Sequence, residues 1–268
     1  MTTLKTLKQD WEWLGENDPL WAVCTDPSRS NGGWNEQEFL ATGEAEVNTV
    51  LGLLRSLRCV PKAGERALDF GCGAGRLTRA LSMHFDNCCG VDISSSMIEA
   101  ATRLNHDRAN CTFMVNCTEK LVDLPCQSFG FIYSSIVLQH LRPGFVISYL
   151  QEFGRLLTTG GVLVFQMPSH RNAFLGGLRS ALHLKSRIGR LREATGQIDS
   201  DPRTKMEMNC LREERIRQVL SGAGCNVVDI RLTNSCDAGF NGNLRYLEAE
   251  PISGYVSKQY VAVKVARG

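Results

Sequence analysis

The chain has 268 residues, of which 43% are hydrophobic and 22% charged, with 30 basic against 28 acidic side chains. These proportions are ordinary for a globular protein, and they exclude a disordered, collagen-like or coiled-coil chain. No run approaches the roughly 18 uncharged apolar residues of a membrane span, and the near-neutral balance argues against a nucleic-acid partner. The first residues lack the apolar stretch of a signal peptide, so we expect a cytoplasmic protein.

Cysteine is frequent, at 11 residues, but the number is odd and no Cys/His set has zinc-site spacing. Several cysteines lie inside apolar runs, where a thiol behaves as a small hydrophobe: Cys88, Cys89, Cys111 and Cys225. We therefore expect reduced, mostly buried thiols and no metal site.

Residues 1–60 hold all four tryptophans and are predicted to form a helical cap ahead of the main domain, residues 61–268. Turn-forming residues are concentrated over 18–35, which is typical of a loop. Apolar residues near a 3.6 period then predict a helix over 36–58, and Pro61 and Gly64 interrupt the chain.

From residue 65 onwards apolar runs alternate with helical patterns, which predicts a parallel sheet with helices on both faces. Strands are expected at 66–70, 88–91, 111–115, 131–134 and 162–167. A helix around 211–222 precedes two further segments, 225–232 and 259–265, which we expect to pair antiparallel at the sheet edge. Residues 169–208 interrupt the alternation and are predicted to be an inserted lid.

A glycine-rich turn follows the first predicted strand and leads into a helix: Gly71-Cys72-Gly73-Ala74-Gly75-Arg76. Glycines let a ligand approach the backbone closely, and the helix N-terminus offers free N–H groups to a carboxylate or phosphate. Arg76 stands where a dinucleotide fingerprint needs a small residue, which argues against NAD. Asp69, just before the glycines, suits a ligand ammonium group and would oppose a pyrophosphate.

A second acid, Asp92, ends the next predicted strand, where a carboxylate can accept both hydroxyls of a ribose. A ligand with an ammonium group, a carboxylate and a free ribose is S-adenosylmethionine. The competing interpretation, in which Asp69 caps a loop and Asp92 caps a helix, does not account for the glycines between them.

Five segments carry a family resemblance: LDFGCGAGRLT (68–78), GVDISSSMI (90–98), FMVNCTEKLVDLP (113–125), FGFIYSSIVLQHL (129–141) and FGRLLTTGGVLVFQMP (153–168). With them the chain resembles the class I S-adenosylmethionine-dependent methyltransferases of the small-molecule type. The resemblance implies an α/β, Rossmann-like sheet of seven strands in the order 3-2-1-4-5-7-6, with the last strand antiparallel.

The resemblance also implies that Asp92 holds the ribose, that Cys117 and Thr118 flank the adenine, and that Ser134 lies beside the methionyl part. Cys117 stands where relatives often have an acid for the adenine amino group, and Gly130 where they often have Asp. The cofactor-binding residues expected are Asp69, Gly71, Gly73, Gly75, Arg76, Asp92, Ile93, Cys117, Thr118 and Ser134.

His140 lies just past the fourth predicted strand, near the expected methyl group, and is either a general base or a structural histidine. The insertion holds six basic residues over 170–192 and no acid. Three interpretations stay open for these basic residues: a solvated helix face, a lid that meets an anionic acceptor, or a surface that contacts lipid or an acidic carrier.

The expected activity is methyl transfer to an oxygen or nitrogen of a small molecule. The alternatives are a non-catalytic cofactor-binding regulator and an RNA methyltransferase. The charge balance and the sequence Tyr133-Ser134-Ser135-Ile136, where such RNA enzymes carry an Asn/Asp-Pro-Pro-Tyr/Phe-like site, argue against the latter.

Overall fold

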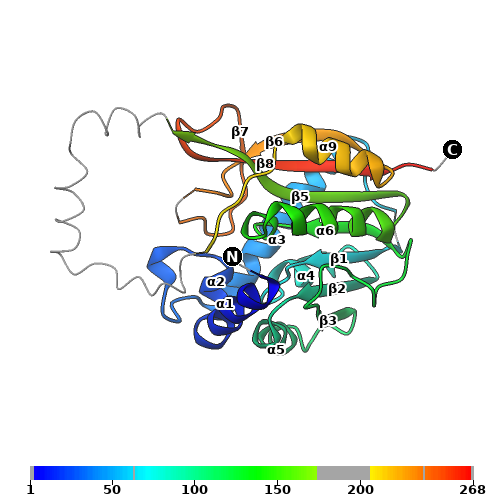
Figure 1. Cartoon of the computed structure of the whole chain (residues 1–268). Coiled ribbons are helices and arrows are strands. Elements are labelled where there is room, and N and C mark those ends of the chain that lie inside the picture. Colours follow the sequence, from blue (N-terminus) through cyan, green and yellow to red (C-terminus); the bar gives the residue numbers. More distant parts are fainter. Residues whose placement is uncertain (1–2, 63, 174–205, 238, 267–268) are drawn as a thin grey trace, which may run out of the picture.

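The structure, a computed structural model, describes residues 3–62, 64–173, 206–237 and 239–266 (Figure 1). Most of the predicted lid, residues 174–205, lies outside the described residues. Of its basic side chains only Arg171 is described, and its guanidinium carbon lies 5.3 Å from the centre of the Tyr255 ring.

The described residues form one eight-stranded sheet in the order β3-β2-β1-β4-β5-β8-β6-β7. Strands β1 to β5 pair in parallel, whereas β8 runs antiparallel to both β5 and β6. The predicted order and its antiparallel last strand are thus confirmed, and β7 adds a two-residue edge strand. The strands are β1 (Arg66–Phe70), β2 (Asn87–Asp92), β3 (Cys111–Val115), β4 (Phe129–Ser134), β5 (Leu157–Ala173), β6 (Cys225–Thr233), β7 (Tyr246–Leu247) and β8 (Ser253–Lys264).

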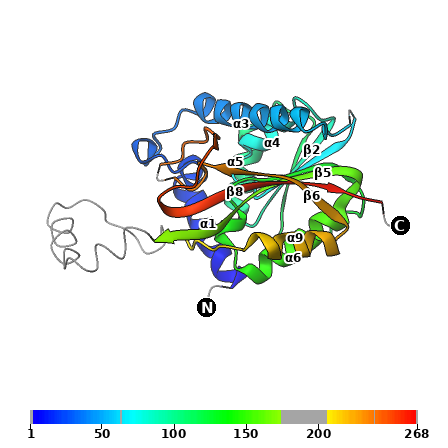
Figure 2. The same ribbon diagram turned by 90° about the horizontal axis from the view of Figure 1, so that it is seen from above.

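Helices cover both faces of the sheet (Figure 2). On one face α3 (Glu36–Ser56) and α4 (Arg76–Leu81) bury a core with Ala67 and Phe131. On the other face α6 (Pro143–Leu156) and α9 (Glu213–Gly222) pack against Leu68 and Ile132. Alternate strand residues therefore serve opposite cores, as the pleat requires, and β4 is buried along its whole length.

Two short helices, α1 (Leu4–Asn17) and α2 (Pro19–Val23), and the 3-10 turn η1 (Pro27–Arg29) precede α3. Helix α1 lies beside α5 (Ser95–Leu104), at the end of the sheet where β1 and β2 finish (Figure 1). Helix α3 packs on the sheet and shares its core, whereas Leu14 of α1 and Ala22 of α2 form a separate small cluster with Met97 of α5.

Strand β5 is longer than the predicted 162–167, because its far half pairs with β8 as a two-stranded ribbon up to Ala173 and Ser253. The register shifts between Pro168 and His170, where proline has no N–H to donate to the ladder. Within the described ranges, no helix has both the length and the apolar character needed to cross a membrane.

Candidate functional site

The glycine turn between β1 and α4 takes a shape that side chains would prevent. Gly71, Gly73 and Gly75 have φ angles of +76°, +50° and +82°, in the left-handed region that glycine tolerates. A Cβ on Gly71 would collide with the Val137 side chain, and one on Gly73 would come within 2.5 Å of Val23 Cγ2. The backbone of the turn therefore borders directly on neighbouring elements and on the cavity.

Asp92 ties this turn to the following helix. Its carboxylate accepts hydrogen bonds from the N–H of Gly73 at 2.9 Å and of Ser94 at 3.0 Å. Burial raises the pKa of Asp92, while these N–H groups act in the opposite direction. Each oxygen retains acceptor capacity, so the side chain can take further donors from a ligand in the cavity.

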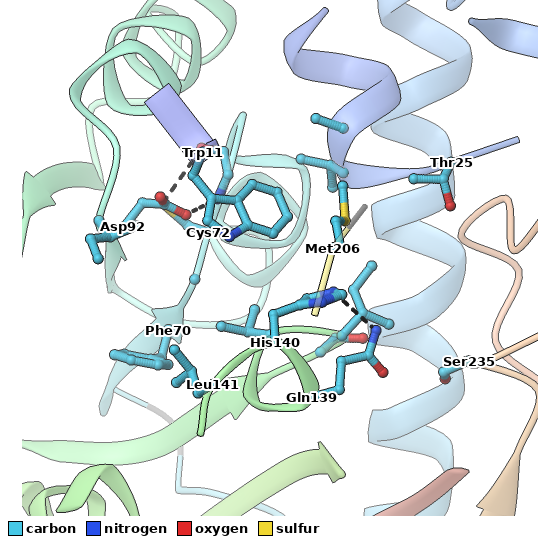
Figure 3. A pocket seen from close by; sticks show the side chains of 18 of the residues that line it. Trp11, Thr25, Phe70, Cys72, Asp92, Gln139, His140, Leu141, Met206 and Ser235 are labelled. Carbon is cyan, nitrogen blue, oxygen red and sulfur yellow. Dashed lines mark hydrogen bonds between the residues drawn. The ribbon is translucent and has the colours of Figure 1, made fainter. Parts of the chain in front are cut away.

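The cavity lies at the carboxyl ends of β1, β2 and β4 and has a volume of about 580 Å³. That size is typical of small-molecule sites. In Figure 3, Asp92 and Ser235 lie on opposite sides of the view, with His140 and Met206 between them. The wall is formed by α1 and α2, the glycine turn, the ends of β2 and β3, the loops after β4 and β6, the segment before α9, and β8. Its residues include Leu4, Leu7, Trp11, Trp21, Val23, Gly71, Gly73, Asp92, Ile93, Asn116, Ile136, His140, Met206, Met208, Ser235, Cys236, Asp237, Phe240 and Tyr255.

His140 is held on three sides. Its Nδ1 lies 3.0 Å from the carbonyl oxygen of Glu207, which fixes Nδ1 as the donor, and its Nε2 accepts from the Gln139 amide at 3.1 Å. The Trp11 ring packs edge-on against it, 5.6 Å away between ring centres. Burial lowers the pKa of His140 to about 4, so the ring is neutral at neutral pH and Nε2 is its acceptor atom. An unperturbed imidazole has a pKa near 6.5, so burial moves His140 away from the range in which a general base works best.

The sequence-predicted residues divide into two groups. Gly71, Gly73, Arg76, Asp92, Ile93 and His140 line the cavity. Asp69, Gly75, Cys117, Thr118 and Ser134 are not among its lining residues.

Asp69 and Ser134 hold the sheet and its helix together. Asp69 is 1% exposed and accepts a hydrogen bond from the Thr78 hydroxyl at 2.7 Å, and burial raises its pKa to about 7. The Ser134 hydroxyl donates to the carbonyl of Phe70 at 3.0 Å, which joins β4 to β1. The other oxygen of Asp69, Oδ1, has no hydrogen-bond partner among the described residues, and its contact with a ligand ammonium group stays a prediction.

At the expected adenine side, the structure brings in Asn116 and leaves Cys117 and Thr118 exposed. The N–H of Asn116 donates to the carbonyl of Asp92 at 2.8 Å, so the residue sits directly beside the acid. The Thr118 hydroxyl donates to the carbonyl of Lys120 at 2.7 Å. Spacing alone did not separate Asn116 from its neighbours.

Arg76 reaches the cavity wall but is committed to an ion pair. Its Nη2 lies 2.8 Å from Glu46 on α3, and both side chains are at most 1% exposed. The Tyr133 hydroxyl donates to the other Glu46 oxygen at 2.7 Å. This buried network pins the start of α4 to α3 and β4, and nothing local in the sequence indicated Glu46 as the partner.

Ile136, just past β4, has a φ of +54°. A β-branched residue rarely adopts this conformation, and such strain concentrates at functional sites. The strained turn therefore forms part of the cavity wall, through Ser135, Ile136 and Val137.

Comparison with known proteins agrees with this geometry. The methyltransferase domain family matches residues 68–165, which include the glycine turn, Asp92 and His140. The ubiquinone biosynthesis O-methyltransferase of Bradyrhizobium diazoefficiens is 33% identical over 111 residues, 41% of this chain and 42% of that protein. Residues 68–165 therefore match a methyltransferase domain.

Another curated relative matches a longer stretch of the chain. The demethylmenaquinone methyltransferase of Tropheryma whipplei is 31% identical over 144 residues, 52% of this chain and 55% of that protein. The chain thus spans about half the length of the curated relatives it matches. Magnesium protoporphyrin IX methyltransferase from Synechocystis PCC 6803 superposes with a TM-score of 0.60 at 19% identity, covering 98% of this chain and all of that one (100%), which shows a shared fold.

The cofactor of such a domain is S-adenosylmethionine, and the cavity fits it on two independent features. The glycine turn has no room for a Cβ at Gly71 and Gly73, and the Asp92 carboxylate faces the cavity from the adjacent strand. Close backbone approach and an acid at the end of the adjacent strand are what an amino acid joined to a free ribose requires.

Proposed function

We propose that the protein transfers a methyl group from S-adenosylmethionine to an oxygen or nitrogen of a small molecule. One observation carries the proposal: a single cavity has the glycine turn and Asp92 at one side and the neutral His140 beyond them. When bound, the cofactor supplies a methyl group on a sulfonium; the acceptor atom bonds to that carbon as the C–S bond breaks, and the acceptor's proton is released.

In this proposal the protein acts mainly by placing the two reactants. Asp92 and the glycine turn orient the cofactor, and His140 Nε2 accepts a hydrogen bond from the acceptor in place of the Gln139 amide. A pKa of about 4 makes His140 a weak proton acceptor at neutral pH. Its role is then chiefly to aim the acceptor atom, with alignment supplying most of the rate gain.

The cavity wall supports an apolar acceptor. The segments before α9 and after β6 contribute Met206, Met208 and Phe240, and β8 contributes Tyr255. Among the described lining residues the one permanent cation is Arg76, which is already paired with Glu46. An uncharged, largely apolar hydroxy compound therefore suits the described wall better than the anionic acceptor considered from the sequence, and quinone-related relatives lend support.

All eleven cysteines are free thiols, which supports a reducing, cytoplasm-like compartment.

The test is methyl transfer from methyl-labelled S-adenosylmethionine to a small-molecule extract, to a panel of uncharged phenols and to total RNA. We expect label in apolar small molecules with the intact protein and none with Asp92→Ala. Binding of S-adenosylhomocysteine without transfer to any acceptor would favour the regulatory alternative. Label confined to RNA would favour the RNA methyltransferase.

A further inference from the structure

The loop after β6 places a buried hydroxyl in the cavity wall that the fold does not use. Ser235 is 4% exposed, lines the cavity, and its Oγ has no hydrogen-bond partner among the described residues. Buried polar groups are almost always paired, so an unpaired one in a cavity wall indicates a partner that comes from outside the fold.

Cys236, the residue after Ser235, belongs to a polar chain of its own. The Cys236 thiol donates to the Gln139 side-chain carbonyl at 3.2 Å, and Gln139 in turn donates to His140. The Gln166 amide donates to the Ser257 hydroxyl at 2.9 Å. The polar chain thus extends back to His140 without including Ser235, whose hydroxyl stays available.

The charge at this side of the cavity limits what Ser235 can bind. Asp237 lines the wall two residues further on, and the segments that supply Met206 to Met208 and Ser235 to Phe240 contribute no lysine or arginine to the described wall. Among the described residues, an anion beside Ser235 would therefore meet the exposed Asp237 carboxylate and no cation on this side of the cavity. An uncharged hydroxyl or carbonyl suits the described wall at Ser235 better than an anion.

We propose that Ser235 is a specificity-determining residue that hydrogen-bonds a second, uncharged oxygen of the methyl acceptor. The inference rests on the proposed function and narrows its substrate class to apolar molecules with two neutral oxygen groups. One oxygen receives the methyl group beside His140, and the other is held by Ser235. An acceptor lacking the second oxygen leaves the Ser235 hydroxyl buried and unpaired, so the site rejects it.

Matched probes test this directly. Dihydroxynaphthalenes with different hydroxyl spacings are each compared with the methylnaphthol in which a methyl group replaces the second hydroxyl. Binding is followed by quenching of protein tryptophan fluorescence, since Trp11 and Trp21 line the cavity, and turnover by labelled methyl transfer. We expect the intact protein to prefer at least one diol over its methyl analogue by about tenfold, the value of one hydrogen bond to a buried group.

Ser235→Ala is expected to abolish that preference by weakening the diol alone, while Ser235→Thr retains it and S-adenosylhomocysteine binding stays unchanged in both. Equal losses for diol and analogue would assign Ser235 a structural role. An unchanged preference in Ser235→Ala, or no preference for any diol in the intact protein, would overturn the inference. Fluorescence detects the preference without turnover, so diol binding without methyl transfer would refute the proposed reaction and leave the Ser235 contact standing.

Discussion

Glu12 on α1 connects the N-terminal helix to the cofactor side of the cavity. Its carboxylate accepts from the N–H of Ser95 at 2.9 Å, the Ser95 hydroxyl at 2.8 Å and the N–H of Ser96 at 3.1 Å. These N–H groups belong to the first turn of α5, where no intrahelical partner exists. Burial opposes ionisation of Glu12, but the hydrogen bonds from Ser95, Ser94 and Ser96 outweigh it and lower its pKa. The carboxylate is thus charged at neutral pH and anchors α1 to the helix that follows Asp92.

The face of α1 next to Glu12 forms part of the cavity wall. Leu4, Leu7 and Trp11 recur at helical spacing and all line the cavity. Releasing Glu12 therefore loosens the wall that packs against His140. Glu12→Gln removes the charge from three hydrogen bonds and from the α5 N-terminus, which weakens the anchor by about 2 kcal/mol.

A loss of about 2 kcal/mol shifts the equilibrium between α1 attached to α5 and α1 detached from it by about 30-fold. We expect S-adenosylhomocysteine to dissociate at least about tenfold faster and the melting temperature to fall by about 4–8 °C. Stopped-flow tryptophan fluorescence measures the dissociation rate, and Glu16→Gln, an exposed position one turn further along α1, is the control. A lower melting temperature with an unchanged dissociation rate would refute the reasoning, because Glu12 would then stabilise the fold without governing the cavity wall.

Three further predictions concern titratable side chains in and beside the cavity. Asp92→Ala should weaken S-adenosylhomocysteine binding by about 3 kcal/mol with the fold retained, and calorimetry showing unchanged affinity would remove Asp92 from the site. The folded pKa of His140, about 4, lies below its ordinary 6.5. The unfolded chain therefore binds a proton first as pH falls from 6.5 to 4, and stability drops by about 3 kcal/mol over that window. Urea unfolding across this range should show this change in the difference in unfolding free energy between the intact protein and His140→Gln, because other titrating groups such as Asp69 contribute equally to both proteins. Glu46→Ala leaves the Arg76 guanidinium buried and unpaired, and should cost about 3–5 kcal/mol of unfolding free energy against a much smaller cost for Glu44→Ala, at a half-buried position on the same helix.

Local sequence rules were sufficient for the sheet and for part of the cofactor site. The alternation of apolar runs and helical patterns predicted strands β1 to β5, because each run must bury both faces between helices. The turn from Gly71 to Gly75 and the position of Asp92 at a strand end were equally legible. Both depend on neighbours within a few residues, through backbone conformation and the direction of a parallel strand.

The remaining features depend on which elements pack together. Asp69 belongs to the same motif as Gly71, yet the pleat turns its side chain toward Thr78 instead of the cavity. Glu12 meets Ser95 and Glu46 meets Arg76 across long stretches of chain, and no periodicity predicts such pairs. His140 was visible as a residue, but its low pKa was not. Burial against Trp11 and the Glu207 carbonyl removes the ring from water, and desolvation of a charge is a property of the assembled tertiary structure.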